Sequence, residues 1–168
     1  EAVVAVSVAA ANRTQVLVAT IDAVLDLVVI DVLSAMNTGH DGSMATIHAN
    51  SPKDCLLRIE NLVAMSSVQV QVSSLRYQIA NAVNIIVQIQ RMRDGARRIT
   101  QIEEVTGTLD GQITTQTLFS YQPHRMGTDG RLIGEFIAHN ARPAALARAQ
   151  YYGLEAEMLA CFNTGGVS

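Results

Sequence analysis

The spacing of apolar residues changes from a helical to an alternating pattern near the middle of this 168-residue chain. In the first half, apolar side chains recur three or four positions apart over residues 52–65 and 74–83, which is typical of helices with one buried face. Ile85, Val87 and Ile89 then alternate with other residues, as in a β-strand. We therefore predict a mixed α/β fold in which a β-meander follows the helices.

The first of these helices has a clear start. Ser51 can accept a hydrogen bond from the backbone N–H of Asp54, and Pro52 suits the first helical position because that position needs no N–H donor. The stripe that this helix is expected to bury consists of Leu56, Leu57, Ile59, Leu62 and Val63. The buried face expected for the second helix consists of Leu75, Ile79 and Ala82.

Glycine-containing turns divide the second half of the chain into strands. Glycine favours tight turns because it adopts positive φ without a steric cost. The expected turns are Asp94-Gly95, Gly107–Gly111 and Asp129-Gly130. The strands that follow them are expected at 97–105, 112–121 and 131–137. Two short helices, at 143–151 and 154–162 with Gly153 between them, complete the prediction.

Residues 1–30 are rich in alanine and valine and contain few turn signals. A buried strand is expected at 15–21, followed by a helix at 23–36 with Asp22 as its N-cap. Three aspartates interrupt the longest apolar run: Asp22, Asp26 and Asp31. Because a carboxylate in hydrocarbon is costly, we do not expect a membrane-spanning helix here.

Charge and composition limit the kinds of partner and site. The formal net charge of -3 gives no reason to expect nucleic acid as a partner. Apolar residues make up 49% of the chain and charged residues 16%, which argues against disorder. Cys55 and Cys161 lie far apart without metal-ligand spacing, so free thiols in a reducing compartment are expected.

Residues 35–50 contain two histidines around a glycine-rich turn that leads into a short apolar strand, expected at 43–48. Thr46 and His48 share one face of that strand because side chains alternate along it. A loop carrying His40 and a strand end carrying His48 can converge on one point. Hydroxyl and imidazole groups can bind a phosphate or position a water. No third and fourth metal ligand is indicated, so a metal site is not expected.

A series of short motifs extends from Asp31 to Phe162. The first two are Thr38-Gly-His-Asp-Gly-Ser and Thr46-Ile-His-Ala-Asn-Ser-Pro. Later ones are Arg58-Ile-Glu-Asn, Gln88-Ile-Gln-Arg, Asp94-Gly-Ala-Arg-Arg and Asp129-Gly-Arg-Leu-Ile-Gly-Glu-Phe. The series resembles the histidine box and the following segments of the type II/IV secretion and pilus-assembly ATPases, especially the CpaF-like ATPases of Tad/Flp pili.

The resemblance implies the C-terminal part of a RecA-like P-loop ATPase domain, which uses ATP and Mg²⁺. By resemblance, His48 lies near the γ-phosphate and couples nucleotide state to subunit motion, with His40 and Thr46 as further catalytic candidates. Thr38 and Gly39 are candidates for nucleotide contact. Implied partners are identical subunits in a hexameric ring and an inner-membrane pilus or secretion platform protein. The implied location is the cytoplasm, at the periphery of the bacterial inner membrane.

Each of these residues also has a structural interpretation. His48 can be a strand-end histidine satisfied by a backbone carbonyl, and His40 can order the turn together with Asp41. Gly39 suits the left-handed residue after a helix. His124 and His139 are expected to lie in loops and to be structural.

The phosphate-binding half of such a site is missing from the sequence. A P-loop needs clustered glycines and a lysine that reaches the phosphates, and the chain has one lysine, Lys53, with no glycine-rich loop before it. In the resembled family the Walker A motif lies upstream of the histidine box, so truncation explains its absence. The Walker B pair aligns with Asp22 and Ala23. Asp22 could hold Mg²⁺ through a water, although a simple helix cap is the alternative.

Four arginines surround the Asp94-Gly95 turn: Arg91, Arg93, Arg97 and Arg98. They form either a solvated hairpin tip or a contact with a neighbouring subunit, since guanidinium pairs well with phosphate or carboxylate. The sequence does not select one of them.

Two hypotheses follow. In the first, the chain is a fragment of an ATP-hydrolysing motor and is inactive alone because it lacks Walker A. In the second, it is a non-catalytic remnant or assembly module that keeps the fold and binds no nucleotide. In both hypotheses the chain is one partial ATPase domain, residues 1–168. Its parts are a divergent segment at 1–30, a histidine-box core at 31–105, and a C-terminal β-meander with helices at 106–168.

Overall fold

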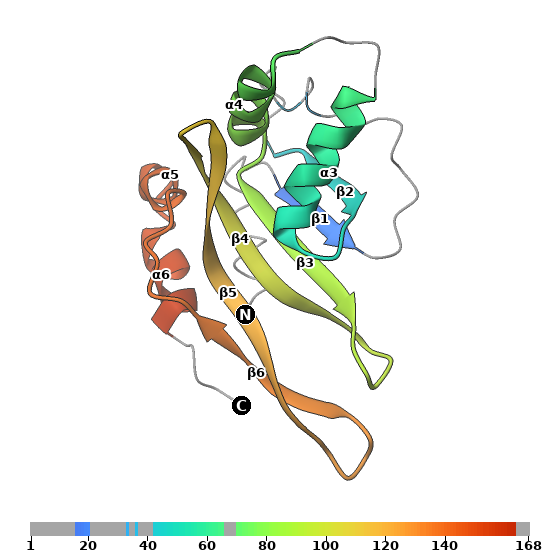
Figure 1. Ribbon diagram of the computed structural model, residues 1–168. Helices are drawn as coiled ribbons and strands as arrows, with labels where there is room; N and C mark the ends of the chain where they lie inside the picture. Colours follow the sequence, from blue (N-terminus) through green and yellow to red (C-terminus); the bar gives the residue numbers. More distant parts are fainter. Residues whose placement is uncertain (1–15, 21–32, 34–35, 37–41, 66–69, 164–168) are drawn as a thin grey trace.

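The computed structural model describes residues 16–20, 33, 36, 42–65 and 70–163. They form one six-stranded sheet in the order β2-β1-β3-β4-β5-β6, with helices on its two faces (Figure 1). The strands are β1 (Val16–Thr20), β2 (Met44–His48), β3 (Ile85–Arg91), β4 (Arg97–Leu109), β5 (Gln112–Met126) and β6 (Leu132–Ala138). The helices are α3 (Pro52–Ala64), α4 (Val72–Ala82), α5 (Leu146–Tyr151) and α6 (Glu155–Asn163). The predicted mixed α/β class, with a meander and short C-terminal helices, is confirmed.

The sheet has a parallel half and an antiparallel half. In the parallel half, β1 lies between β2 and β3 and pairs with both. In the antiparallel half, β3, β4, β5 and β6 pair in chain order. Sequence neighbours therefore pair with each other in the meander, whereas the parallel half needs long crossover connections.

The helices cover different faces of β3. Ile86 packs with α3 and α4 in a cluster that contains the fully buried Ile59 and Ile79. Ile85 and Val87, which point to the opposite face, pack with strands of the meander and with Phe162 of α6. Residues Ile85 to Gln88 are consequently all buried. The alternation predicted for β3 is present, but both of its faces are covered, as is typical of strands in a parallel sheet.

Helix α3 begins as the sequence predicts. Ser51 has extended backbone angles, and its hydroxyl accepts a hydrogen bond from Asp54 N at 3.1 Å, with Pro52 in the first turn. Cys55 lies in the same turn and is a free thiol, and burial raises its pKa to about 12. One member of the predicted stripe was wrong: Leu57 is 52% exposed, because it lies beside the stripe rather than within it.

The hairpin between β4 and β5 is longer than predicted. Gly107 lies inside β4 with a φ of 132°, at a register shift between Val105 and Gly107, and does not begin a turn. The turn is formed by Asp110 and Gly111, both with positive φ, which matches the twist of a two-residue hairpin. Glycine therefore marks a bulge at the first position and a turn at the second.

Strand β5 also continues past the predicted end at residue 121. Pro123 lies within the strand, although proline has no N–H to donate to a neighbouring strand. Pairing of β5 with β4 ends at Ser120, and beyond it β5 pairs with β6 alone, with a register shift between Pro123 and Arg125. The edge of β5 that faced β4 is therefore unpaired at Pro123, so the sheet accommodates a residue without an N–H. The prediction that His124 lies in a loop was wrong, since His124 is a residue of β5.

Predictions for the first forty residues are tested in part. The strand expected at 15–21 is present as β1. Leu33 and Met36, the two described residues of the helix expected at 23–36, are helical and buried. The rest of that helix, including its proposed cap Asp22, lies outside the described residues.

Candidate functional site at the carboxyl ends of the parallel strands

The three parallel strands end together at one edge of the sheet. In their register, Thr20 of β1 is opposite His48 of β2 on one side and Ile89 of β3 on the other. The chain passes from β1 to β2 on one side of β1 and then returns to β3 on its other side. Such a reversal of strand order leaves a crevice at the carboxyl ends, where ligands of parallel α/β sheets bind.

His48 is the last residue of β2 and lies at this reversal point. It is half-buried and follows Ile47, which is 2% exposed and faces the helices. Helix α3 starts only four residues later. The imidazole is therefore held between a strand end and a helix start, on a part of the backbone that is fixed at both ends.

Two glutamines of β3 hold the backbone after His48; they belong to the motif Gln88-Ile-Gln-Arg, for which the sequence predicted no role. Gln88 Nε2 donates to Ala49 O at 3.0 Å, and Gln90 Nε2 donates to Asn50 O at 3.0 Å. Consecutive carbonyls after β2 are thus bound by side chains of a strand two positions away in the sheet. The signal in the sequence was a pair of glutamines within an otherwise apolar strand.

Gln88 also carries an unsatisfied polar atom in the described core. Its side chain is 1% exposed, and its Oε1 has no hydrogen-bond partner. A buried carbonyl without a partner costs free energy, and such groups commonly bind water or a ligand. The site therefore contains an acceptor that is free to receive one more donor.

The structure brings together only some of the predicted site residues. Thr46 lies two positions before His48 on β2 and is exposed, so the two share a face of the strand. Thr38, Gly39, His40 and Asp22 lie outside the described residues. The convergence of His40 with His48 stays a prediction.

Among the four arginines near Asp94, Arg98 has a structural role. Its guanidinium donates to both carboxylate oxygens of Asp94, at 2.8 and 2.7 Å. Asp94 also accepts from Leu132 N at 2.8 Å. The Arg98 guanidinium, followed by the Leu132 N–H, holds the pKa of the Asp94 carboxyl well below its ordinary value. Arg91, Arg93 and Arg97 are exposed.

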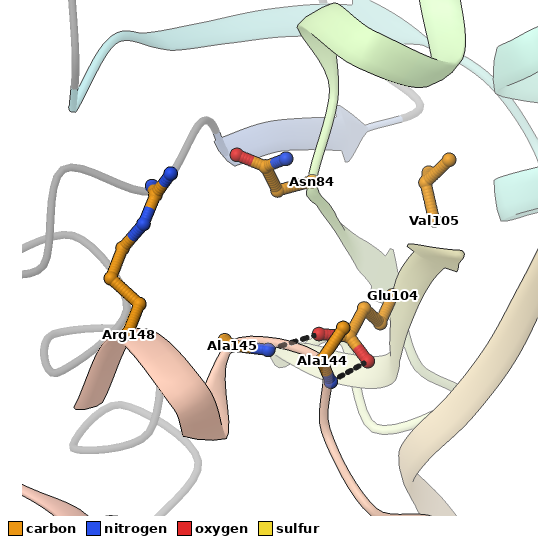
Figure 2. Close-up of a pocket in the computed structure, with 6 residues that line it drawn as sticks. All are labelled: Asn84, Glu104, Val105, Ala144, Ala145 and Arg148. Carbon is orange, nitrogen blue, oxygen red and sulfur yellow. Dashed lines mark hydrogen bonds between the residues drawn. The ribbon is translucent and has the colours of Figure 1, made fainter. Parts of the chain in front are cut away.

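A separate cavity of about 150 Å³ lies between β4 and the start of α5, lined by Asn84, Glu104, Val105, Ala144, Ala145 and Arg148 (Figure 2). Glu104 is 2% exposed, and its carboxylate accepts from the backbone N–H groups of Ala144 and Ala145 at 2.9 and 3.0 Å. It also accepts from Gln116 Nε2 at 2.6 Å. These bonds occupy the carboxylate and attach the C-terminal helices to the sheet, so Glu104 is structural.

Two further findings concern the described residues as a whole. No helix in the described part of the chain is long and apolar enough to cross a membrane. The described residues also contain no group of three or more histidine, cysteine or acidic side chains arranged to hold a metal ion.

Comparison with known proteins identifies the family. The family model "Type II/IV secretion system protein" matches residues 18–153, which include the last part of β1, strands β2 to β6 and helices α3 to α5. The chain belongs to this family. The match covers His48, the two glutamines and the entire meander.

Curated relatives of the chain are conjugal transfer proteins. A putative conjugal transfer protein of Mycobacterium tuberculosis (strain H37Rv) is 32% identical over 113 residues, which are 67% of this chain and 31% of the relative. Conjugal transfer protein TrbB of Rhizobium radiobacter is 34% identical over 93 residues, which are 55% of this chain and 27% of the relative. The matched region spans less than a third of each relative's length.

Proposed function

We propose that this chain is the C-terminal part of an ATP-hydrolysing motor of the type II/IV secretion family. The observation that carries the proposal is the position of His48, at the carboxyl end of a parallel strand and beside the reversal of strand order. In this proposal His48 contacts the γ-phosphate side of bound ATP, and Thr46 supplies a hydroxyl on the same face.

The described residues fit one side of a nucleotide only. The imidazole of His48 and the hydroxyl of Thr46 can donate to phosphate oxygens. The cradle of backbone N–H groups and the cation that a P-loop provides are absent from this sequence, whose single lysine, Lys53, is exposed in the first turn of α3. When bound, Mg²⁺ and ATP would supply the phosphoryl chemistry. The 168 residues by themselves are therefore proposed to bind no nucleotide.

Partners and location follow from the same proposal. The longer protein would act as a hexameric ring of identical subunits and would work on a platform protein at the cytoplasmic face of the inner membrane. Within the family, the motifs around His48 and Asp94 favour Tad/Flp pilus assembly, as in CpaF. The names of the curated relatives favour conjugal transfer instead. A pull-down of each platform protein with the ring would separate these two assignments.

The alternative is a non-catalytic assembly module with the same fold. It is favoured by the missing Walker A motif and by the aspartate-alanine pair at the position of the Walker B residues. Under this alternative, His48 has only a structural role, and Gln88 and Gln90 stabilise the turn that follows it.

Replacement of His48 distinguishes the two. In a longer protein that carries these residues together with a Walker A motif, His48→Ala should lower kcat about 10²-fold or more while the Kd for ATP stays nearly unchanged. His124→Ala is a matched control, because His124 pairs with Glu135 on β6 at 3.1 Å, away from the site. Unchanged turnover in His48→Ala, with normal folding, would favour the assembly module.

A further inference from the structure

Positive charge is concentrated in two hairpin tips. We define the tips as residues 91–98, between β3 and β4, and residues 124–135, between β5 and β6. They contain six of the chain's twelve basic residues and three of its fifteen acidic ones, which gives them a net charge of +3 in a chain of net charge -3. The remainder of the sequence therefore has a net charge of -6. An asymmetry of this kind favours an anionic partner at one end of the molecule.

The two tips form one surface. Figure 1 shows both of them at the end of the sheet away from α4. They separate where the pairing of β4 with β5 ends, at Gln101 and Ser120. Asp94 then joins them again by accepting from Leu132 N, and Arg98 Nη2 donates to Leu132 O at 3.3 Å. These hydrogen bonds hold the tips side by side and occupy both carboxylate oxygens of Asp94.

Each acidic side chain of this surface lies beside an arginine or a histidine of the same surface. Asp94 is 3% exposed and is bound by Arg98. Asp129 lies 3.8 Å from Arg131, and Glu135 lies 3.1 Å from His124. The exposed arginines of the two tips are Arg91, Arg93, Arg97, Arg125 and Arg131. All the cations are arginines, whose planar fork binds phosphate in a bidentate manner.

Apolar side chains accompany these arginines. Met126 and Ile133 are each 43% exposed, and Ile133 is directly opposite Arg125 in the β5–β6 register. Neither tip contains phenylalanine, tyrosine or tryptophan, the large rings on which nucleic-acid bases commonly stack. Projecting hairpins with arginines beside exposed apolar side chains fit a flat anionic layer with an apolar interior.

We propose that the two hairpin tips dock on a bilayer that contains anionic phospholipids. The arginines contact the headgroup phosphates, and Met126 and Ile133 lie at the boundary with the acyl chains. This inference depends on the charges and geometry of the meander and is independent of whether His48 contacts a nucleotide.

Vesicle binding of the 168-residue chain tests the proposal. The chain should cosediment with vesicles of phosphatidylcholine and phosphatidylglycerol (7:3), and not with pure phosphatidylcholine, and binding should fall as salt is raised. Arg93→Gln/Arg125→Gln should weaken binding about tenfold or more. The control Lys53→Gln/Arg142→Gln removes the same charge from exposed residues outside the tips and should bind nearly like the wild type.

Three results would overturn the proposal. The first is no binding of the wild type to the anionic vesicles, and the second is an equal loss of binding in both double variants. The third is tighter binding to duplex DNA than to vesicles at equal phosphate concentration, which would assign the surface to nucleic acid. Thermal unfolding of each variant shows whether it is folded. If Arg93→Gln/Arg125→Gln does not fold, the single variant Arg131→Gln takes its place and should weaken binding severalfold.

Discussion

The parallel and antiparallel halves of this sheet are specified in different ways. Strands β3 to β6 pair with their neighbours in sequence, through turns that the chain marks with glycine. Strand β1 instead pairs with β2 and β3, whose first residues lie 28 and 69 positions after Val16. The half with local pairing carries the basic hairpin tips, and the half with non-local pairing carries His48. The nucleotide contact proposed for His48 thus lies in the part of the fold that is hardest to specify locally.

The largest expected effect tests whether the two halves fold together. Ile79 of α4 is fully buried in a cluster that joins β2 and β3 with Val105 of β4. Ile79→Ala should lower the free energy of unfolding by about 2–5 kcal/mol through lost burial and the cavity it leaves. Because the cluster bridges the halves, a single urea transition should shift as a whole.

Leu57→Ala is the matched control for that variant. Leu57 is an apolar helix residue of the same layer, but it is 52% exposed, so its truncation should cost about 0.5 kcal/mol or less. Two separate transitions in Ile79→Ala, with the meander unaffected, would show that the antiparallel half folds alone.

A smaller, pH-dependent effect is expected in the meander. The pKa of Asp94 is lowered in the folded protein, by Arg98 first and by the Leu132 N–H second. A group with a lowered folded pKa stabilises the fold at pH values above its unfolded pKa, near 3.8, and loses that contribution as the pH falls through the folded pKa. Asp94→Asn should therefore be less stable than the wild type at pH 7, and the difference should shrink progressively below about pH 4.

Urea unfolding of both proteins between pH 7 and pH 2.5 measures this difference. Asp129→Asn is the control, because Asp129 is 61% exposed and 3.8 Å from Arg131, and it should change stability little at any pH. If the two proteins differ in free energy of unfolding by the same amount at every pH, the ionised Asp94 carboxylate does not stabilise the fold as described.

The sequence predicted the meander and α3 because their signals are local. Ser51, Pro52 and Asp54 define a helix start within four residues, and Asp94-Gly95 defines a hairpin. The ends of two strands were predicted too early, and each lies beside a bulge, at Gly107 and between Pro123 and Arg125, whose existence depends on the neighbouring strand. Local rules identify such residues as breakers, although the sheet accommodates them.

The candidate site was predicted less completely. His48 and Thr46 were found through the strand that carries them and through family resemblance. Gln88 and Gln90 belong to a motif of that resemblance, but their role was missed because it depends on β2 ending two strands away, which no local pattern encodes. Arg98 could not be separated from its neighbours in sequence, since its pairing with Asp94 and Leu132 requires the second hairpin.

The central claim is that these residues supply one side of a nucleotide site and no more. Isothermal titration of the 168-residue chain with ATP and Mg²⁺ tests it most directly. We expect no binding with a Kd below about 1 mM, because the phosphates would meet His48 without a P-loop lysine or its glycine-rich cradle. Sub-millimolar binding, abolished by His48→Ala, would contradict the claim and show that the chain contains a complete site.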